Sequence, residues 1–207
     1  MRVLLTGFQP FGDLTVNPSQ CIIEHFQAQQ RDDLITRVLP TEYAVAGQWI
    51  EKAIHDFNLD AVISLGVAQS RQTISLERIA VNVDDASLAD NAGVLASGEL
   101  IAPDGPVAYW STLPLSAMRA ALEARGIPVN ISNHAGAYIC NHAFYTARHT
   151  LECLGRSIPC GFIHVPDLAK TDGDTTTGLP LEVMIEAVEI CLEVVGVKRQ
   201  EQTWISG

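Results

Sequence analysis

Short β-rich runs alternate with amphipathic helical stretches along most of this chain, and this alternation restricts its fold more than any other feature. Apolar and β-branched runs predict strands over residues 2–6, 34–39, 60–67, 74–83, 129–132 and 160–165. Amphipathic patterns predict helices over residues 18–29, 42–57, 115–125, 138–154 and 179–195. Alternation at this spacing is typical of an α/β fold, in which a mostly parallel sheet carries helices on both faces.

Several predicted helix ends have local signals. Asn17 and Pro18 supply an N-cap and a proline at the first helical position, and Thr41 is a second candidate cap. Gly126 and Gly196 follow the third and the last helical patterns, where glycine commonly ends a helix. These signals set the expected boundaries of the helical layers.

Residues 84–113 interrupt the alternation. They are rich in Asp, Gly, Pro and Ser and predict an irregular excursion with little regular structure. No repeat, low-complexity tract or linker accompanies this segment, and 207 residues are enough for one large core. We therefore expect a single domain over residues 1–207, with a tail from about residue 198.

Charge and cysteine usage restrict the partners and the compartment. The 24 acidic and 13 basic side chains give a net charge of −11, which disfavours nucleic acids and anionic membranes as partners. The five cysteines are an odd number without a C-x-x-C pair, as expected for reduced thiols. The N-terminus lacks a signal-peptide pattern, and no apolar run approaches 18 residues. These features predict a cytoplasmic protein.

Cys140 is the strongest candidate for a nucleophile. It lies in the string SNHAGAYICNHAFY, just after small residues and in the first turn of a predicted helix. Unpaired N–H groups at a helix start favour a thiolate, and the N–H of Cys140 could help to bind an oxyanion. The alternative is an inert, buried cysteine. The other four cysteines lie in apolar patterns and are predicted to be core residues: Cys21, Cys153, Cys160 and Cys191.

His164 is the best candidate for the base that a thiol nucleophile requires. It lies near the end of the apolar run 160–165, although a buried histidine that bonds to the backbone is an equally ordinary reading. His142 is a poor partner because side chains two positions apart on a helix face different ways. His134 remains possible. Three further histidines have polar helical neighbours and are predicted to face solvent: His25, His55 and His149.

Glu77 is the candidate for the group that orients the base. It lies within SLERIAVN, and an acid inside an apolar run requires a partner. The partner could be structural, as with Arg71 or Arg78, or it could be His164. The sequence leaves these alternatives open.

Two other chemistries find little support. His134, Cys140 and His142 match no common zinc spacing, so no metal site is predicted. TGFQPFG lacks the glycine and lysine pattern of a phosphate loop. Its Phe8 and Phe11 flank a proline at a strand end, where they could form either a packed turn or an apolar wall for a small flat ligand.

Five separated segments together resemble pyroglutamyl-peptidase I, the pyrrolidone-carboxylate peptidase family. They occur in that family's order, over most of the chain up to about residue 170: TGFQPFG with NP (6–18), SLERIAVN (75–82), DN-x-G (90–93), AG-x-Y-I-CNH (135–142) and GFIHVP (161–166). The resemblance implies a three-layer α/β/α sandwich and a cytosolic cysteine peptidase that removes an N-terminal pyroglutamyl residue from peptides. The family's Cys-His-Glu triad falls on Cys140, His164 and Glu77.

The resemblance also implies partners and a substrate pocket. Family members commonly form homodimers or homotetramers and need no metal or cofactor. The expected substrates are peptides that begin with pyroglutamate. The residues expected to contact the substrate are Phe8, Phe11, Val67, Tyr138 and Ile139, and at Val67 main-chain groups could hydrogen-bond the lactam.

The chain departs from the family pattern around that pocket. The family's GQAGGR is GVAQSR here, so that Val67 and Gln69-Ser70 are changed, and ARIPDN is ASLADN, with Ser87 and Leu88. Asp167 stands where an aromatic residue is common. Three alternatives are therefore a cysteine amidase of different acyl specificity, a non-catalytic binding protein, and a phosphorylase-like enzyme that shares the architecture.

Overall fold

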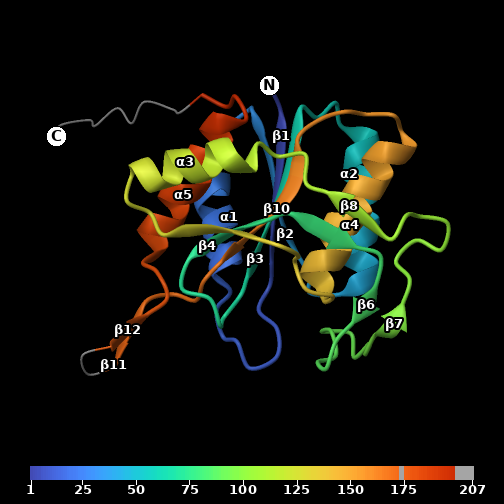
Figure 1. Cartoon of the computed structure of the whole chain (residues 1–207), viewed down its shortest axis with the longest axis horizontal. Helices are drawn as coiled ribbons and strands as arrows, with labels where there is room; N and C mark the ends of the chain where they lie inside the picture. The colour runs from blue at the N-terminus through green and yellow to red at the C-terminus, as the bar shows by residue number, and fades with distance from the viewer. Residues whose placement is uncertain (173–174, 199–207) are drawn as a thin grey trace.

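Six strands form a central sheet in the computed structural model, which describes residues 1–172 and 175–198 (Figure 1). The sheet order is β2-β1-β3-β10-β4-β9. The strands span Leu34–Leu39 (β2), Val3–Phe8 (β1), Ala61–Val67 (β3), Cys160–Val165 (β10), Ile74–Glu77 (β4) and Val129–Ser132 (β9). Every residue of β1, β3, β4 and β10 is buried, as expected for strands whose two faces are both covered.

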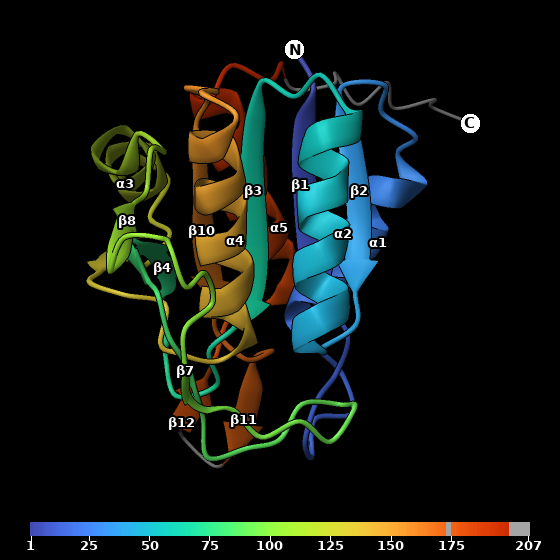
Figure 2. The ribbon, with the colours of Figure 1, turned by 90° about the vertical axis from the view of Figure 1, so that its right-hand side faces the viewer.

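The predicted fold class is confirmed, since helices cover both faces of this mostly parallel sheet (Figures 1 and 2). One apolar core joins the sheet to three helices, α1 (Pro18–Ala28), α3 (Leu115–Ala124) and α5 (Leu181–Val194). A second core joins its other face to α2 (Tyr43–Asp56) and α4 (Ile139–Cys153). Strands β2, β1, β3 and β10 run in parallel, whereas β4 is antiparallel to β10 and parallel to β9.

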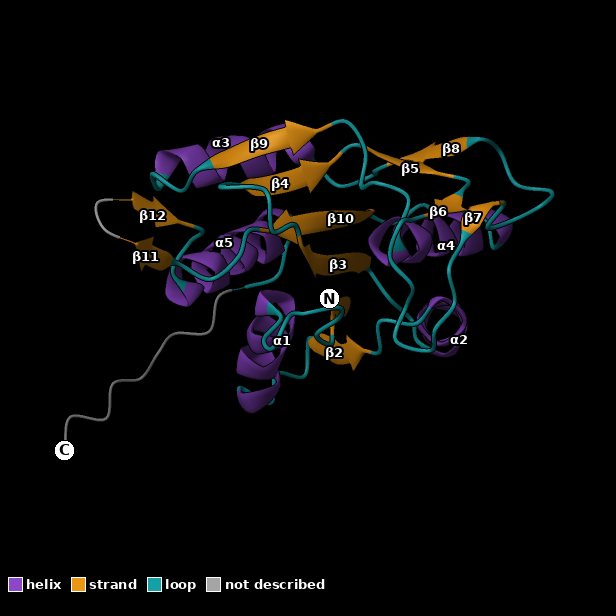
Figure 3. Ribbon diagram, turned by 90° about the horizontal axis from the view of Figure 1, so that it is seen from below, coloured by secondary structure: helices purple, strands orange, loops and turns teal. Residues whose placement is uncertain are grey.

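The predicted extended run 74–83 divides at Arg78. β4 belongs to the central sheet, while β5 (Ile79–Val81) leaves it and pairs with β8 (Ala108–Trp110). The excursion is also more regular than expected, because β6 (Asp84–Asp85) pairs with β7 (Ser97–Glu99). Figure 3 shows these small sheets beside α4, at one end of the molecule.

Helix α1 begins as predicted, but α2 does not. The N–H of Ser19 donates to Asn17 Oδ1 at 3.0 Å, which confirms the Asn17 cap. The expectation for Thr41 is wrong, because its hydroxyl donates to the carbonyl of Gln9. The first turn of α2 is instead satisfied from the excursion, since the N–H of Tyr43 donates to Asp90 Oδ2 at 3.0 Å. A partner 47 residues away leaves no local sequence signal.

The five cysteines are free, and two of the four core assignments are confirmed. Cys160 and Cys191 are buried, but Cys21 is half-buried and Cys153 is exposed on the last turn of α4. The structure adds an unpredicted hairpin of β11 (Lys170–Asp172) and β12 (Thr175–Thr177). Of the predicted tail, residues 199–207 lie outside the described residues. None of the described helices is long and apolar enough to cross a membrane.

Candidate active site

Strand register places the candidate base and acid on one face of the sheet. His164 on β10 lies opposite Gly66 of β3 and opposite Ser75 of β4. Because side chains alternate along a strand, Glu77 lies on the same face as Ser75 and is the diagonal neighbour of His164. This is the face that α2 and α4 cover.

The imidazole and the carboxylate are in direct contact. His164 Nδ1 lies 2.7 Å from Glu77 Oε1, and both residues are buried. Burial alone would raise the pKa of Glu77, but the hydrogen bond and charge of His164, together with hydrogen bonds from Ser132 and Arg71, outweigh it and hold the pKa of this carboxyl below its ordinary value. An ionised carboxylate only accepts hydrogen bonds, so it fixes the proton on Nδ1 and leaves Nε2 with a lone pair.

Arg71 is a second partner of the same carboxylate. Its Nη1 atom donates to Glu77 Oε1 at 2.5 Å, with the guanidinium partly open to solvent. Arg78 turns away and bonds to Asn133 Oδ1. The two readings of Glu77 that the sequence left open are thus both present, because the carboxylate contacts an arginine and His164 together.

The sulfur of Cys140 lies over Gly66, the strand neighbour of His164. A Cβ atom added to Gly66 would lie 2.6 Å from Cys140 Sγ and 2.8 Å from Cζ of Phe162. The ring of Phe162 in turn packs against His164, with 4.8 Å between centroids. Glycine at position 66 therefore provides the space that the thiol occupies over β3, at the residue paired with His164. The only sequence signal for this role of Gly66 is a glycine inside a predicted strand, and the sequence analysis did not use it.

Cys140 lies at the start of a helix, where backbone N–H donors lack partners within the helix. Cys140 is the second residue of α4, and the N-cap residue Tyr138 makes no side-chain capping bond. The first N–H groups of a helix have no partner within the helix, so those of Ile139, Cys140 and Asn141 are available to a ligand. A developing negative charge on a substrate oxygen next to Cys140 would be stabilised there.

The helix start does not lower the pKa of the thiol overall, which corrects the expectation from sequence. Burial, followed by the negative charge of Glu77, raises the pKa of Cys140 to about 12. Arg71 and a backbone hydrogen bond act in the opposite direction and are outweighed. Ionisation of this thiol at neutral pH therefore requires transfer of its proton to a neighbouring base.

The five residues expected to contact the substrate lie at different depths. Phe8 is buried and packs against Phe162, and Val67 and Ile139 are also buried. Phe11 and Tyr138 are half-buried, with ring centroids 5.7 Å apart. The tyrosine hydroxyl donates to the carbonyl of Ala89 at 3.1 Å. The side chains of Phe11 and Tyr138 are therefore the accessible part of this group.

The other histidines have separate surroundings. His142 bonds to Asp84 Oδ2 at 2.7 Å and packs against Tyr43, as expected for a side chain on another face of the helix. The expectation that His149 faces solvent is wrong, because this half-buried side chain contacts the hydroxyl of Tyr109. Among the described residues, no group of three or more His, Cys, Asp or Glu side chains is placed to hold a metal ion.

Asn141 and Asp90 support the site, although the sequence analysis did not single them out. Asn141, next to Cys140, accepts from the N–H of Val81 and donates to the carbonyls of Val81 and Val83, which ties β5 to the start of α4. Asp90 organises the excursion, since its Oδ1 accepts from the N–H groups of Ala92 and Val94. Both residues belong to quoted sequence segments, but their role is to hold loops in place.

Comparison with known proteins agrees with this arrangement. A family model described as pyroglutamyl peptidase matches residues 1–198. A pyrrolidone-carboxylate peptidase of Pyrococcus furiosus is 38% identical over 202 residues, which cover 94% of this chain and 97% of that protein. One of Oceanobacillus iheyensis is 40% identical over 92% of this chain and 97% of that protein. A crystal structure of the Pyrococcus furiosus pyrrolidone carboxyl peptidase superposes with a TM-score of 0.87, at 37% identity over 94% of this chain and 98% of that one.

Proposed function

The chain belongs to the pyroglutamyl peptidase family and is a cysteine peptidase, and we propose that Cys140, His164 and Glu77 are the triad with which it removes pyroglutamate from peptide N-termini. The observation that carries this assignment is the 2.7 Å contact between His164 Nδ1 and Glu77 Oε1. His164 is paired across the sheet with Gly66, and the sulfur of Cys140 lies over Gly66. A nucleophile, a base and a group that orients the base are the parts that acyl transfer requires.

The reaction begins with transfer of the Cys140 proton to His164 Nε2. The thiolate then attacks the carbonyl carbon that links pyroglutamate to the next residue. N–H groups at the start of α4 bind the resulting oxyanion, a contribution typically worth a few kcal/mol per donor. The imidazolium, stabilised by Glu77, gives its proton to the leaving amine as the C–N bond breaks. Water, deprotonated by His164, hydrolyses the thioester and releases pyroglutamate.

Recognition of the lactam ring is assigned to the apolar surface next to the nucleophile. Phe11 and Tyr138 are only half-buried, with 5.7 Å between their ring centroids, whereas Phe8, Val67 and Ile139 are buried. Pyroglutamate has no free α-amine, so an apolar pocket without an acceptor for an ammonium group disfavours ordinary N-termini. Main-chain groups at Val67 are the proposed partners of the lactam amide.

We expect a pyroglutamyl anilide to be hydrolysed with a kcat/KM at least about 10²-fold above those of prolyl and glutaminyl anilides. The three substrates differ only in the acyl group, so their ratio measures recognition of the lactam. Because a valine replaces the family's usual glutamine at position 67, a cysteine amidase of altered acyl specificity is the second candidate. A preference for the prolyl or the glutaminyl anilide would support that candidate and contradict ours.

We also propose that the chain assembles into a homodimer or a homotetramer through the excursion. Five of its apolar side chains are more than half exposed, which is unusual for a cluster on one segment: Val94, Leu95, Leu100, Val107 and Trp110. Val107 is 88% exposed and Trp110 64%. A second copy of the chain would remove this surface from water.

Light scattering during size-exclusion chromatography is expected to give a mass of two or four chains for the wild type and of one chain for V107E/W110E. Burial of two glutamates in the interface would cost several kcal/mol of association energy, because an ionised carboxylate is strongly hydrated. V45E, which places a charge at another exposed apolar position, on α2, is the matched control and should keep the wild-type mass. A wild type that elutes as one chain would contradict the proposal.

A cytoplasmic location is the remaining part of the proposal. Its support is the set of five unpaired cysteines, which suits a reducing compartment. The net charge of −11 supports peptides as partners in preference to nucleic acids.

A further inference from the structure

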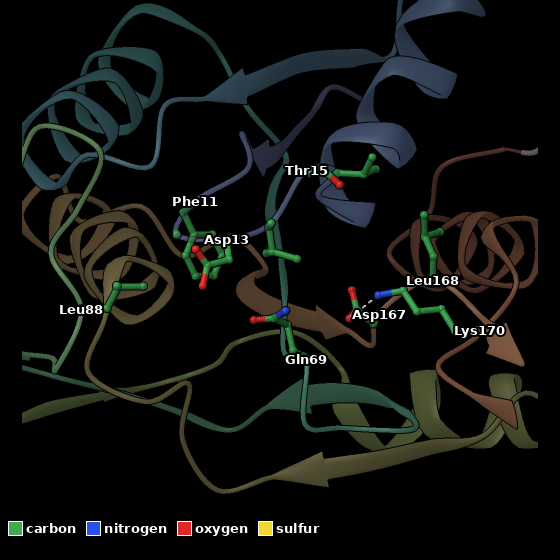
Figure 4. Close-up of a pocket in the computed structure, with 11 residues that line it drawn as sticks. Phe11, Asp13, Thr15, Gln69, Leu88, Asp167, Leu168 and Lys170 are labelled. Carbon is green, nitrogen blue, oxygen red and sulfur yellow. Dashed lines mark ion pairs between the residues drawn. The ribbon is translucent and has the colours of Figure 1, made fainter. Parts of the chain in front are cut away.

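A cavity of about 510 Å³ is lined by residues that follow β1, β3 and β10, the last of which carries His164. It lies where the chain leaves the carboxyl ends of β1, β3 and β10, the edge at which ligands of parallel sheets bind. Figure 4 shows Phe11, Asp13 and Leu88 on one side of it, Asp167 and Lys170 on the other, and Gln69 between them. The eleven described residues that line the cavity do not include Cys140, His164 or Glu77, so the cavity extends beyond the reacting atoms.

The direction of the reaction determines which part of a peptide reaches this cavity. The leaving amine takes its proton from His164, so the chain that follows pyroglutamate starts at the imidazole. Asp167 is three residues after His164, a distance of about 10 Å along an extended strand. A peptide that leaves the imidazole along this loop would place its first side chain near Asp167 and Gln69. The ring of Phe11, which packs on Tyr138, belongs both to this cavity and to the proposed lactam pocket, so the two regions adjoin there.

The chemistry of the cavity favours a side chain with an apolar stem and a positive end. Phe11 and Leu88 supply apolar wall, with Leu88 Cδ2 3.3 Å from the position of a Cβ on Gly12. Asp13 and Asp167 supply two carboxylates against the single ammonium of Lys170.

Asp167 is the better placed of the two carboxylates. Its side chain is only 22% exposed, and its carbonyl accepts from the N–H of Leu179, which fixes the loop. Lys170 Nζ lies 3.6 Å from Asp167 Oδ2 on a side chain that is 71% exposed, so a cation of the substrate can replace it.

We propose that this cavity binds the side chain of the residue that follows pyroglutamate and selects lysine or arginine there. The inference rests on the proposed function, because it takes the leaving amine to face His164. Three of the lining residues, Gln69, Leu88 and Asp167, are also positions at which this chain departs from the family pattern.

The test uses pyroglutamyl tripeptides that differ only in the second residue, which is lysine, leucine or glutamate. For the wild type we expect kcat/KM to be about tenfold higher with lysine than with glutamate, and leucine to be intermediate. D167N should reduce the lysine-to-glutamate ratio about threefold, and D167K should bring it below one. K170A, which removes the competing ammonium, should raise it. D32N makes the same change of charge at an exposed position before β2 and should leave the ratio unchanged.

Equal kcat/KM values for lysine and glutamate in the wild type would overturn the inference. So would ratios that stay unchanged in both D167N and K170A. A pyroglutamyl anilide separates this failure from that of the proposed function, because its leaving group carries no amino-acid side chain. If the anilide is cleaved without any preference among the tripeptides, only the inference fails. If the wild type does not cleave the anilide, the proposed function and the inference fail together.

Discussion

Replacement of Cys140 by alanine is expected to lower kcat for a pyroglutamyl anilide by at least about 10⁴-fold. No other group among the neighbouring side chains can form the thioester, and the backbone donors of α4 stabilise an oxyanion only after attack has occurred. The rate of anilide release by purified enzyme, with thermal unfolding recorded on the same sample, is the measurement. The variant should stay folded, since it removes one sulfur atom from a half-buried position.

C153A is the matched control for this experiment. Cys153 is also a cysteine of α4, but it is exposed and lies 13 positions after Cys140, at the far end of the helix. The C153A variant should keep the wild-type kcat, and the only expected difference is that one surface thiol is no longer available for alkylation. If C140A retained the wild-type rate, the sulfur would have no part in the reaction and the triad would be refuted.

Replacement of Glu77 by glutamine is expected to lower kcat by about 10² to 10⁴-fold with a small change in KM. The amide is close to the carboxylate in size, but it does not stabilise the imidazolium and does not fix the proton on Nδ1 of His164. Alkylation of Cys140 by iodoacetamide gives a second readout. Glu77 acts on the thiol in two opposite ways, because its negative charge raises the pKa of Cys140 and also stabilises the imidazolium that receives the thiol proton. We assign the larger effect to the imidazolium, so E77Q should move the alkylation profile to higher pH.

E189Q controls for the loss of a buried glutamate that is paired with arginine. Glu189 on α5 accepts from Arg31 Nη1 at 2.9 Å, on the far side of the sheet from Cys140. This variant should be less stable but should keep kcat at temperatures where it is folded. A comparable fall of kcat in E189Q, or an undiminished kcat in E77Q, would contradict the role assigned to Glu77.

Acid provides a further check on Glu77. Its pKa is lowered in the folded state, so its contribution to stability is complete above the unfolded value of about 4.3 and is lost as the pH falls through the folded value. The difference in melting temperature between wild type and E77Q should therefore be largest near neutral pH. It should shrink as the pH falls below about 4.

Elements with a strong period or a local cap were predictable. The strands β2, β9 and β10 and the start of α1 agree with the sequence prediction, because runs rich in β-branched residues and the Asn17-Pro18 cap act over a few residues. The division of the run 74–83 at Arg78 was not predictable, since both halves are β-rich and only tertiary pairing assigns them to different sheets. The first turn of α2 depends on Asp90, whose distance along the chain hides it from any local pattern.

The sequence predicted which residues form the candidate site, but it did not predict the contacts between them. Glu77 inside an apolar run pointed to a buried partner, yet only strand register shows that His164 and Arg71 reach the same oxygen atom. Register likewise explains Gly66, which lies beside His164 and beneath the sulfur. The pKa of Cys140 was misjudged because helix position was visible in the sequence and the extent of burial was not.

Asp90 and its neighbour Asn91 have a consequence for engineering. Asp90 holds the start of α2, while Asn91 donates to the carbonyl of Pro10 and, through its N–H, to that of Thr41. One short stretch of the excursion thereby anchors the loop after β1 and the start of α2, whereas His164 and Glu77 lie on strands and Cys140 lies on α4. An exchange of segment 86–94 between relatives would therefore have to keep Asp90 and Asn91, and it would also touch the hydrogen bond from Tyr138, two residues before Cys140, to the carbonyl of Ala89.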